Sequence, residues 1–149
     1  MSIFQALAIS ASGLSAQRLR MEVVASNLAN ADSTTGVGQA YRRRVVLMSP
    51  MSTGGAQFTL PSQVSQVSGR ADLQGVTVTQ IGEDQTPLRR VYKPGDPNAD
   101  AQGFVTKPNV DTVTEMVDMV AATRAYQANV TAMTAAKQMF TDTLRISRS

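Results

Sequence analysis

The sequence contains no cysteine, no histidine and no tryptophan among its 149 residues. Without cysteine the chain forms neither disulfides nor thiol-based sites, and without histidine as well the usual zinc sites and histidine-dependent catalytic triads are excluded. Aromatic residues are also scarce, at 5% of the chain. Because bulky side chains dominate the burial in a thick core, this composition favours close helix contacts and small sheets instead.

Long hydrophobic runs are missing too. No apolar run approaches the roughly 20 residues of a membrane-spanning helix. The amino terminus, MSIFQALAISASGLSAQR, lacks the basic start of a cleaved signal peptide, and polar residues interrupt its apolar ones. The net charge of +3 is mild, so charge alone does not require a nucleic acid or an anionic membrane. We therefore expect neither a membrane span nor a cleaved signal.

The strongest pattern lies in the last forty residues. One heptad position takes Met116, Thr123, Val130, Lys137 and Leu144, and the position three residues on takes Met119, Tyr126, Met133 and Phe140. Alternating steps of three and four place these residues on one stripe, which is typical of helices that pack lengthwise. Thr112 and Glu115 have the spacing of a capping box. The pattern predicts one uninterrupted helix of about 35 residues, roughly 50 Å long.

A weaker helical pattern covers residues 2–30. Leu7, Leu14, Met21 and Leu28 fall seven residues apart, with many small residues between them. A glycine in the middle of a helix, such as Gly13, lowers helix stability by roughly 1 kcal/mol relative to alanine. We therefore expect Gly13 to mark a tight contact or a slight bend.

The middle of the chain predicts short strands. Residues 41–48 and 76–81 have strand patterns, residues 88–92 are a candidate partner of the second strand, and residues 103–108 lead into the long helix. Residues 49–70 predict a mobile loop. The expected fold class is α+β: long N- and C-terminal helices paired as a coiled-coil-like hairpin, with a small β-rich insert. The expected divisions are 1–36 for the first helix and its following turn, 37–108 for the insert, and 109–149 for the second helix.

The sequence contains only partial matches to motifs that carry chemistry. Asp96, Asn98 and Asp100 have the spacing of a calcium loop, but Ala101 and Lys107 stand where that loop needs glycine and glutamate. The basic residues cluster at Arg42–Arg44 and at Arg89 and Arg90; nucleic-acid binding, a solvated face and an acidic patch on a partner all remain compatible with them. Glu83 and Asp84 read as a solvated corner. The sequence predicts no catalytic, cofactor-binding or metal site.

Two packed helices alone are only marginally stable. Ordering their backbones costs about as much free energy as burying apolar side chains along one shared interface contributes. The remaining neighbours of such a pair must be other chains. We therefore expect the ends of the chain to take part in assembly.

Two runs resemble known proteins. The run SASGLSAQRLRMEVVASNLANADSTT, residues 10–35, resembles the amino-terminal signature of bacterial flagellar rod and hook proteins. The run from Gly103 to Ile146 is similar to proximal rod proteins of the FlgC type, through Pro108-Asn109-Val110, Glu115-Met116, Arg124-Ala125-Tyr126 and Ala128-Asn129-Val130. The segment KPGDPNAD, residues 93–100, also resembles a turn of that family, although Asp96 stands where histidine is expected.

The resemblance implies a structural subunit of the proximal rod of the flagellar basal body, polymerising into a helical tube that transmits torque and surrounds the export channel. It implies export through the flagellar type III apparatus without a cleaved signal, and a place in the periplasmic rod. The implied partners are other copies, other rod proteins, proteins of the membrane-ring/rod junction and the export apparatus, with no cofactor and no nucleic acid. A soluble helical adaptor of a type III export apparatus is the alternative.

The patterns and the resemblance together predict an assembly interface. Its predicted members are Leu7, Leu14, Met21, Asn27, Leu28, Asn30, Asn109, Glu115, Met116, Met119, Tyr126, Asn129, Val130, Met133, Phe140 and Leu144.

Overall fold

The computed structural model of the chain describes residues 3–34, 40–51 and 75–146. Its elements are, in order, α1 (Ile3–Asn30), β1 (Arg44–Pro50), β2 (Val76–Glu83), β3 (Arg89–Tyr92), β4 (Phe104–Lys107) and α2 (Thr112–Ile146). The α+β class is confirmed, and α2 has the predicted length of 35 residues. No helix in the described part of the chain is long and apolar enough to cross a membrane.

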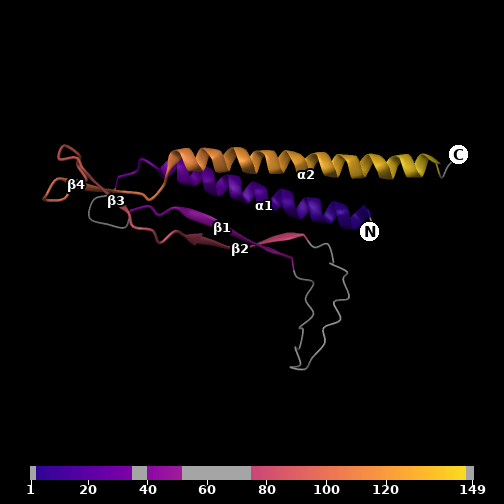
Figure 1. Cartoon of the computed structure of the whole chain (residues 1–149), viewed down its shortest axis with the longest axis horizontal. Helices are drawn as coiled ribbons and strands as arrows, with labels where there is room; N and C mark the ends of the chain where they lie inside the picture. The colour runs from indigo at the N-terminus through magenta and orange to yellow at the C-terminus, as the bar shows by residue number, and fades with distance from the viewer. Residues whose placement is uncertain (1–2, 35–39, 52–74, 147–149) are drawn as a thin grey trace, which may run out of the picture.

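The elements form an elongated stack (Figure 1). The helices α1 and α2 lie side by side, the hairpin of β1 and β2 covers the opposite side of α1, and β3 and β4 project beyond the start of α2. The helix α1 is therefore the middle layer. Its residues must serve two neighbours, which explains why small residues are spread over so much of its surface.

The two helices run antiparallel. Near the start of α1, the ring of Phe4 meets that of Phe140 edge to face, with centroids 6.1 Å apart. Farther along, the Thr123 hydroxyl lies 3.6 Å from the sulfur of Met21. The prediction that the chain's two ends pair as a hairpin is thus confirmed.

The face that α2 turns toward α1 differs from the predicted stripe. We call this face the inner stripe: Glu115, Met119, Ala122, Tyr126, Asn129, Met133 and Ala136 are buried or half-buried. Of the predicted set beginning at Met116, only Thr123 is half-buried, whereas Val130, Lys137 and Leu144 are exposed. These positions lie outside the contact with α1, and their predicted contacts with other chains stay a prediction. Both sets alternate in steps of three and four with Met119 and Tyr126, but the alanines let the two helix backbones approach more closely.

Two glycines make close approaches to α1 possible. A Cβ on Gly13 would lie 2.9 Å from Nδ2 of Asn129, which confirms the predicted tight contact between the helices. A Cβ on Gly75 would lie 2.3 Å from Oγ of Ser12. That hydroxyl accepts a hydrogen bond of 3.0 Å from the backbone N–H of Val76 and thereby fastens β2 to α1.

The strand pairing corrects the prediction. The strand β2 pairs antiparallel with β1, and β3 pairs antiparallel with β4, which forms within the segment predicted only to lead into the helix. Residues 88–92 are therefore not the partner of β2. Strand pairing depends on contacts between distant segments, which local alternation does not encode. Of the predicted mobile loop 49–70, Ser49 and Pro50 belong to β1, and residues 52–70 lie outside the described residues.

The start of α2 also differs from the predicted capping box. Asp111 caps the helix: its carboxylate accepts the hydroxyl of Thr114 at 2.6 Å, and backbone N–H groups of the first turn lower the pKa of its side chain further. The side chain of Glu115 points elsewhere, into contacts with α1 and with the residues before β1. Asp111 serves as the cap, and Glu115 is free for another role.

Candidate functional site

A cluster of polar groups built around two buried side chains joins α1, the start of β1 and the start of α2. We call it the polar junction, and its members are Asn27, Tyr41, Arg43, Arg44, Asn109 and Glu115. The side chain of Glu115 is 0% exposed and Asn27 is 1% exposed. Buried polar groups cost free energy unless they are hydrogen-bonded, so each group in this cluster needs a partner.

Asn27 uses its entire hydrogen-bonding capacity. Its Nδ2 donates to the carbonyl oxygen of Arg44 at 2.8 Å and to Oε2 of Glu115 at 3.0 Å. Its Oδ1 accepts from the backbone N–H of Arg44 at 2.9 Å and from the hydroxyl of Tyr41 at 2.9 Å. An amide side chain offers two donors and two acceptor lone pairs. Asn27 therefore pairs with Arg44 as a neighbouring strand would, and it also contacts α2.

Asn109 binds the backbone of Arg43, the residue before Arg44. Its Oδ1 accepts the backbone N–H of Arg43 at 2.8 Å, and its Nδ2 donates to Oγ1 of Thr86 at 2.7 Å and to the carbonyl oxygen of Asp84 at 3.1 Å. Two asparagines thus bind two consecutive backbone N–H groups. This arrangement fixes where β1 leaves the helical pair.

A charge pair completes the junction. Nε of Arg43 donates to Oε1 of Glu115 at 2.6 Å. This hydrogen bond is the largest cause of the raised pKa of Arg43; burial opposes it, and the charges of Glu115, Asp118 and Asp84 add to it. Charge-assisted hydrogen bonds of this length are stronger than neutral ones. Arg43 therefore stays charged, and Glu115 has both of its carboxylate oxygens hydrogen-bonded.

Further charges extend the junction along α2. Asp118 pairs with Arg20 at 3.0 Å and with Arg43 at 3.4 Å. Hydrogen bonds from the backbone and hydroxyl of Thr86 are the main reason why the pKa of the Asp84 carboxyl is lowered. A cavity of about 260 Å³ lies beside these groups, between α1, β1 and the start of α2. These ion pairs connect α1, the start of β1 and the start of α2.

The predicted basic cluster is not one surface patch. Arg43 is in the polar junction, and Arg42 donates to the carbonyl oxygen of Asp84 at 3.3 Å. Arg90 pairs with Asp100 at 2.6 Å, and Arg44 lies 5.6 Å from the ring centre of Tyr41. Most of these arginines are bound within the chain, so the reading as a solvated face is wrong for Arg43.

The residues with calcium-like spacing serve the turn between β3 and β4. Oδ1 of Asp96 accepts the N–H of Asn98 at 3.0 Å, and Oδ1 of Asp100 accepts the N–H of Phe104 at 2.8 Å. Gly103 has a φ of +82° there, which glycine adopts readily. Within the described residues, no three acidic side chains gather in a way that can hold a metal ion.

The structure divides the predicted interface residues by position. Asn27, Asn109 and Glu115 belong to the polar junction. The half-buried members are Leu7, Leu14, Met21, Leu28, Asn30, Met119, Tyr126, Asn129 and Met133. The exposed members are Met116, Val130, Phe140 and Leu144.

Sequence reasoning missed the partners of Glu115. Arg43 was read only as part of a basic cluster, and Asn27 only as an interface residue, whereas both donate hydrogen bonds to Glu115. One signal was available: Glu115 lies four residues before Met119, on the line that continues through Tyr126. A carboxylate on that line needs a buried cation, but the sequence does not say which one.

Comparison with known proteins agrees with this architecture. Residues 7–36 match the family described as flagella basal body rod protein, and residues 101–146 match the family described as flagellar basal body rod FlgEFG protein C-terminal. These ranges cover most of α1 and all of α2, the two helices that the polar junction connects. The two family matches place the chain in the class of flagellar basal-body rod proteins.

Full-length relatives identify the family within that class. The chain is 48% identical over 155 residues to the flagellar basal-body rod protein FlgC of Bacillus subtilis, with 99% of this chain and 100% of the relative covered. It is 41% identical to that of Salmonella typhimurium over 149 residues, with the same coverage. It is 38% identical to that of Borreliella burgdorferi, with 98% of each chain covered. The chain belongs to the FlgC family of flagellar basal-body rod proteins.

Proposed function

We propose that this protein is a structural subunit of the flagellar basal-body rod. Membership of the FlgC family supports the proposal, because its full-length relatives bear the name of rod proteins. The chemistry of the polar junction agrees with it, since the junction's hydrogen bonds and ion pairs connect parts of one chain and leave no free nucleophile or acid–base pair among those described side chains.

The observation that carries the proposal is an exposed apolar face on α2. Val113, Val117 and Val120 are 67%, 64% and 52% exposed, and Met116 beside them is 54% exposed. These residues lie on the side of α2 that faces away from α1. Contiguous apolar surface of this kind marks a protein interaction site.

The finer proposal follows from the family resemblance. The subunit belongs to the proximal rod, where copies of it and other rod proteins form a helical tube that transmits torque and surrounds the export channel. It reaches the periplasm through the flagellar export apparatus without a cleaved signal. The predicted interface residues that remain exposed, Met116, Val130, Phe140 and Leu144, contact neighbouring subunits in this tube.

Purification of basal bodies tests the function. A strain that lacks the chain is complemented with the wild type, with Val120→Asp or with Ala101→Asp, which places the same charge at an exposed position of the β3–β4 turn. We expect wild type and Ala101→Asp to restore swimming and to co-purify with detergent-extracted basal bodies, and Val120→Asp to do neither. If the wild type stays in the cytoplasm as a stable heterodimer, the adaptor function replaces the rod function.

A further inference from the structure

One line along α2 carries two matching series of residues. Val113, Val117, Val120 and Arg124 follow one another in steps of four, three and four, and Thr131, Ala135, Gln138 and Asp142 repeat the same steps. We call the two series the amino and carboxyl halves of the outer stripe. All eight residues are exposed. Every member is 18 residues from its counterpart, which equals five turns or about 27 Å of helix, so both halves point in the same direction.

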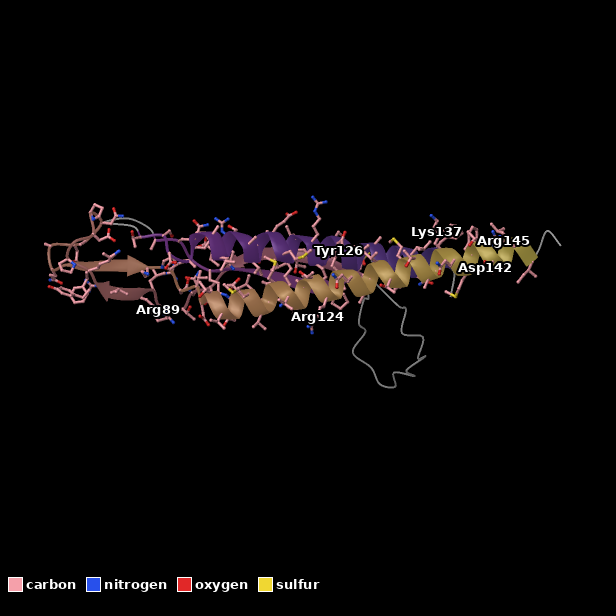
Figure 2. All side chains as sticks on the ribbon, turned by 90° about the horizontal axis from the view of Figure 1, so that it is seen from above. Arg89, Arg124, Tyr126, Lys137, Asp142 and Arg145 are labelled. Atoms are coloured by element: carbon pink, nitrogen blue, oxygen red, sulfur yellow. The ribbon has the colours of Figure 1, made fainter. Side chains whose placement is uncertain are left out.

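The two halves are complementary in size and charge. The amino half presents three valines and ends with a cation, while the carboxyl half presents threonine, alanine and glutamine and ends with an anion. The side chains of Arg124 and Asp142 have no ion pair and no hydrogen bond among the described residues. Figure 2 labels Tyr126, Lys137 and Arg145 along one edge of α2, with Arg124 at the opposite edge.

We propose that α2 of one copy binds α2 of a second copy in parallel, shifted by five helical turns, so that the amino half of one meets the carboxyl half of the other. The shift places Val113 opposite Thr131, Val117 opposite Ala135 and Arg124 opposite Asp142. Large side chains then meet small ones, and the two unpaired charges neutralise each other. The inference rests on the proposed function, in which this face is covered by other subunits.

An antiparallel pair is less suitable. It also places Arg124 opposite Asp142, but it sets Val120 opposite Ile146, so two large side chains meet where the parallel shift pairs Val120 with Gln138. The parallel shift covers the whole amino half. It uses different surfaces on the two copies, and such heterologous contacts produce open polymers rather than closed dimers.

The length of α2 matches twice the proposed shift, as the repeated addition of copies along one line requires. A copy bound at the amino half and another bound at the carboxyl half are separated by two shifts, about 54 Å along the axis. A helix of 35 residues is about 52 Å long. The α2 helices of the two neighbours therefore follow each other along the line, and each added copy exposes a new half-stripe.

Cysteine cross-linking tests the shift, since the natural chain has no cysteine. The variant carrying Arg124→Cys and Asp142→Cys is expressed in cells that lack the wild type, oxidised, and followed into isolated basal bodies on a non-reducing gel. The two sites are about 27 Å apart within one helix, far beyond the reach of an internal disulfide. We expect a ladder of dimers, trimers and larger species. The matched control, Arg124→Cys with Lys137→Cys, loses the ladder because Lys137 lies on a different face.

The outcomes separate the shift from the function. Dimers alone would indicate antiparallel pairing and overturn the shift, and so would uncross-linked chains within basal bodies; in both cases the rod function stands. If the variant and the wild type are both absent from basal bodies, the rod function fails. In that case the purified variant with Arg124→Cys and Asp142→Cys is oxidised at high concentration. A ladder of cross-linked oligomers then supports the shift, and the absence of a ladder overturns the shift. Circular dichroism checks that each variant keeps its helices.

Discussion

Asn27 and Glu115 are 88 residues apart in the sequence and are joined by a buried hydrogen bond of 3.0 Å. The bond connects the last turns of α1 to the first turn of α2. Asn27 also pairs with the backbone of Arg44, so one amide group holds both helices and the insert together. Its position makes the polar junction the most sensitive point of the fold.

We expect Asn27→Ala to lower the free energy of unfolding by about 2–4 kcal/mol, because it leaves several buried groups without partners. Urea denaturation followed by circular dichroism measures this change. The matched control is Asn30→Ala, since among the described residues the Asn30 side chain makes one local bond, to the carbonyl oxygen of Ser26. Equal losses for the two variants would contradict the role of Asn27.

The Arg43–Glu115 pair is expected to show strong coupling in a double-mutant cycle of Arg43→Gln and Glu115→Gln. Removing either charge leaves the other buried, so each single variant loses stability and the double variant loses less than their sum. We expect an interaction free energy of about 1–3 kcal/mol. The exposed pair Arg18–Glu22, measured in the same way, is the reference at about 0.3–0.5 kcal/mol. A coupling no larger than this reference would refute the assignment.

Gly13→Ala separates helix propensity from packing. Alanine is favoured over glycine within a helix by roughly 1 kcal/mol, but its Cβ would lie 2.9 Å from Nδ2 of Asn129. We expect the substitution to destabilise the wild type and to stabilise the Asn129→Ala variant, where the obstacle is gone. Thermal unfolding of the four proteins measures both effects. A gain in stability in both backgrounds would show that the helices do not meet closely at Gly13.

The cap of α2 predicts a pH dependence. Hydrogen bonds, above all from the hydroxyl of Thr114, lower the pKa of Asp111 below its ordinary value of 3.8. A group with a lowered folded pKa contributes stability that is present above the unfolded pKa and is lost as the pH falls through the folded pKa. Asp111→Asn keeps a capping side chain but removes this titration.

We therefore expect the variant to lose less stability than the wild type as the pH falls from about 5 to 2. Urea titrations at several pH values measure the difference. Asp142→Asn is the matched control, because it makes the same substitution at an exposed side chain that has no ion pair or side-chain hydrogen bond among the described residues. Parallel curves for the wild type and Asp111→Asn would contradict the assignment of the cap.

The sequence predicted the helices well because their signals are local. The spacing of Met119, Tyr126 and Met133 identified one of the two heptad positions of the inner stripe, and the length of α2 followed from the uninterrupted pattern. The strands were predicted in place, but β2 was given the wrong partner, since pairing depends on segments that are distant in the chain. Residues 37–108 as a separate insert, and the predicted interface residues, remain predictions.

By itself, the sequence determined that two amphipathic helices stand at the ends of the chain, that cysteine and histidine chemistry is excluded, and that these helices have more apolar surface than one partner covers. Only the tertiary structure decided which side of α2 meets α1 and which side remains exposed. The reason is that either of two heptad positions could complete a stripe with Met119 and Tyr126: the one that begins at Met116 or the one that begins at Glu115. The more apolar one, at Met116, is exposed, while Ala122 and Ala136 permit close packing and Glu115 finds Asn27 and Arg43 inside.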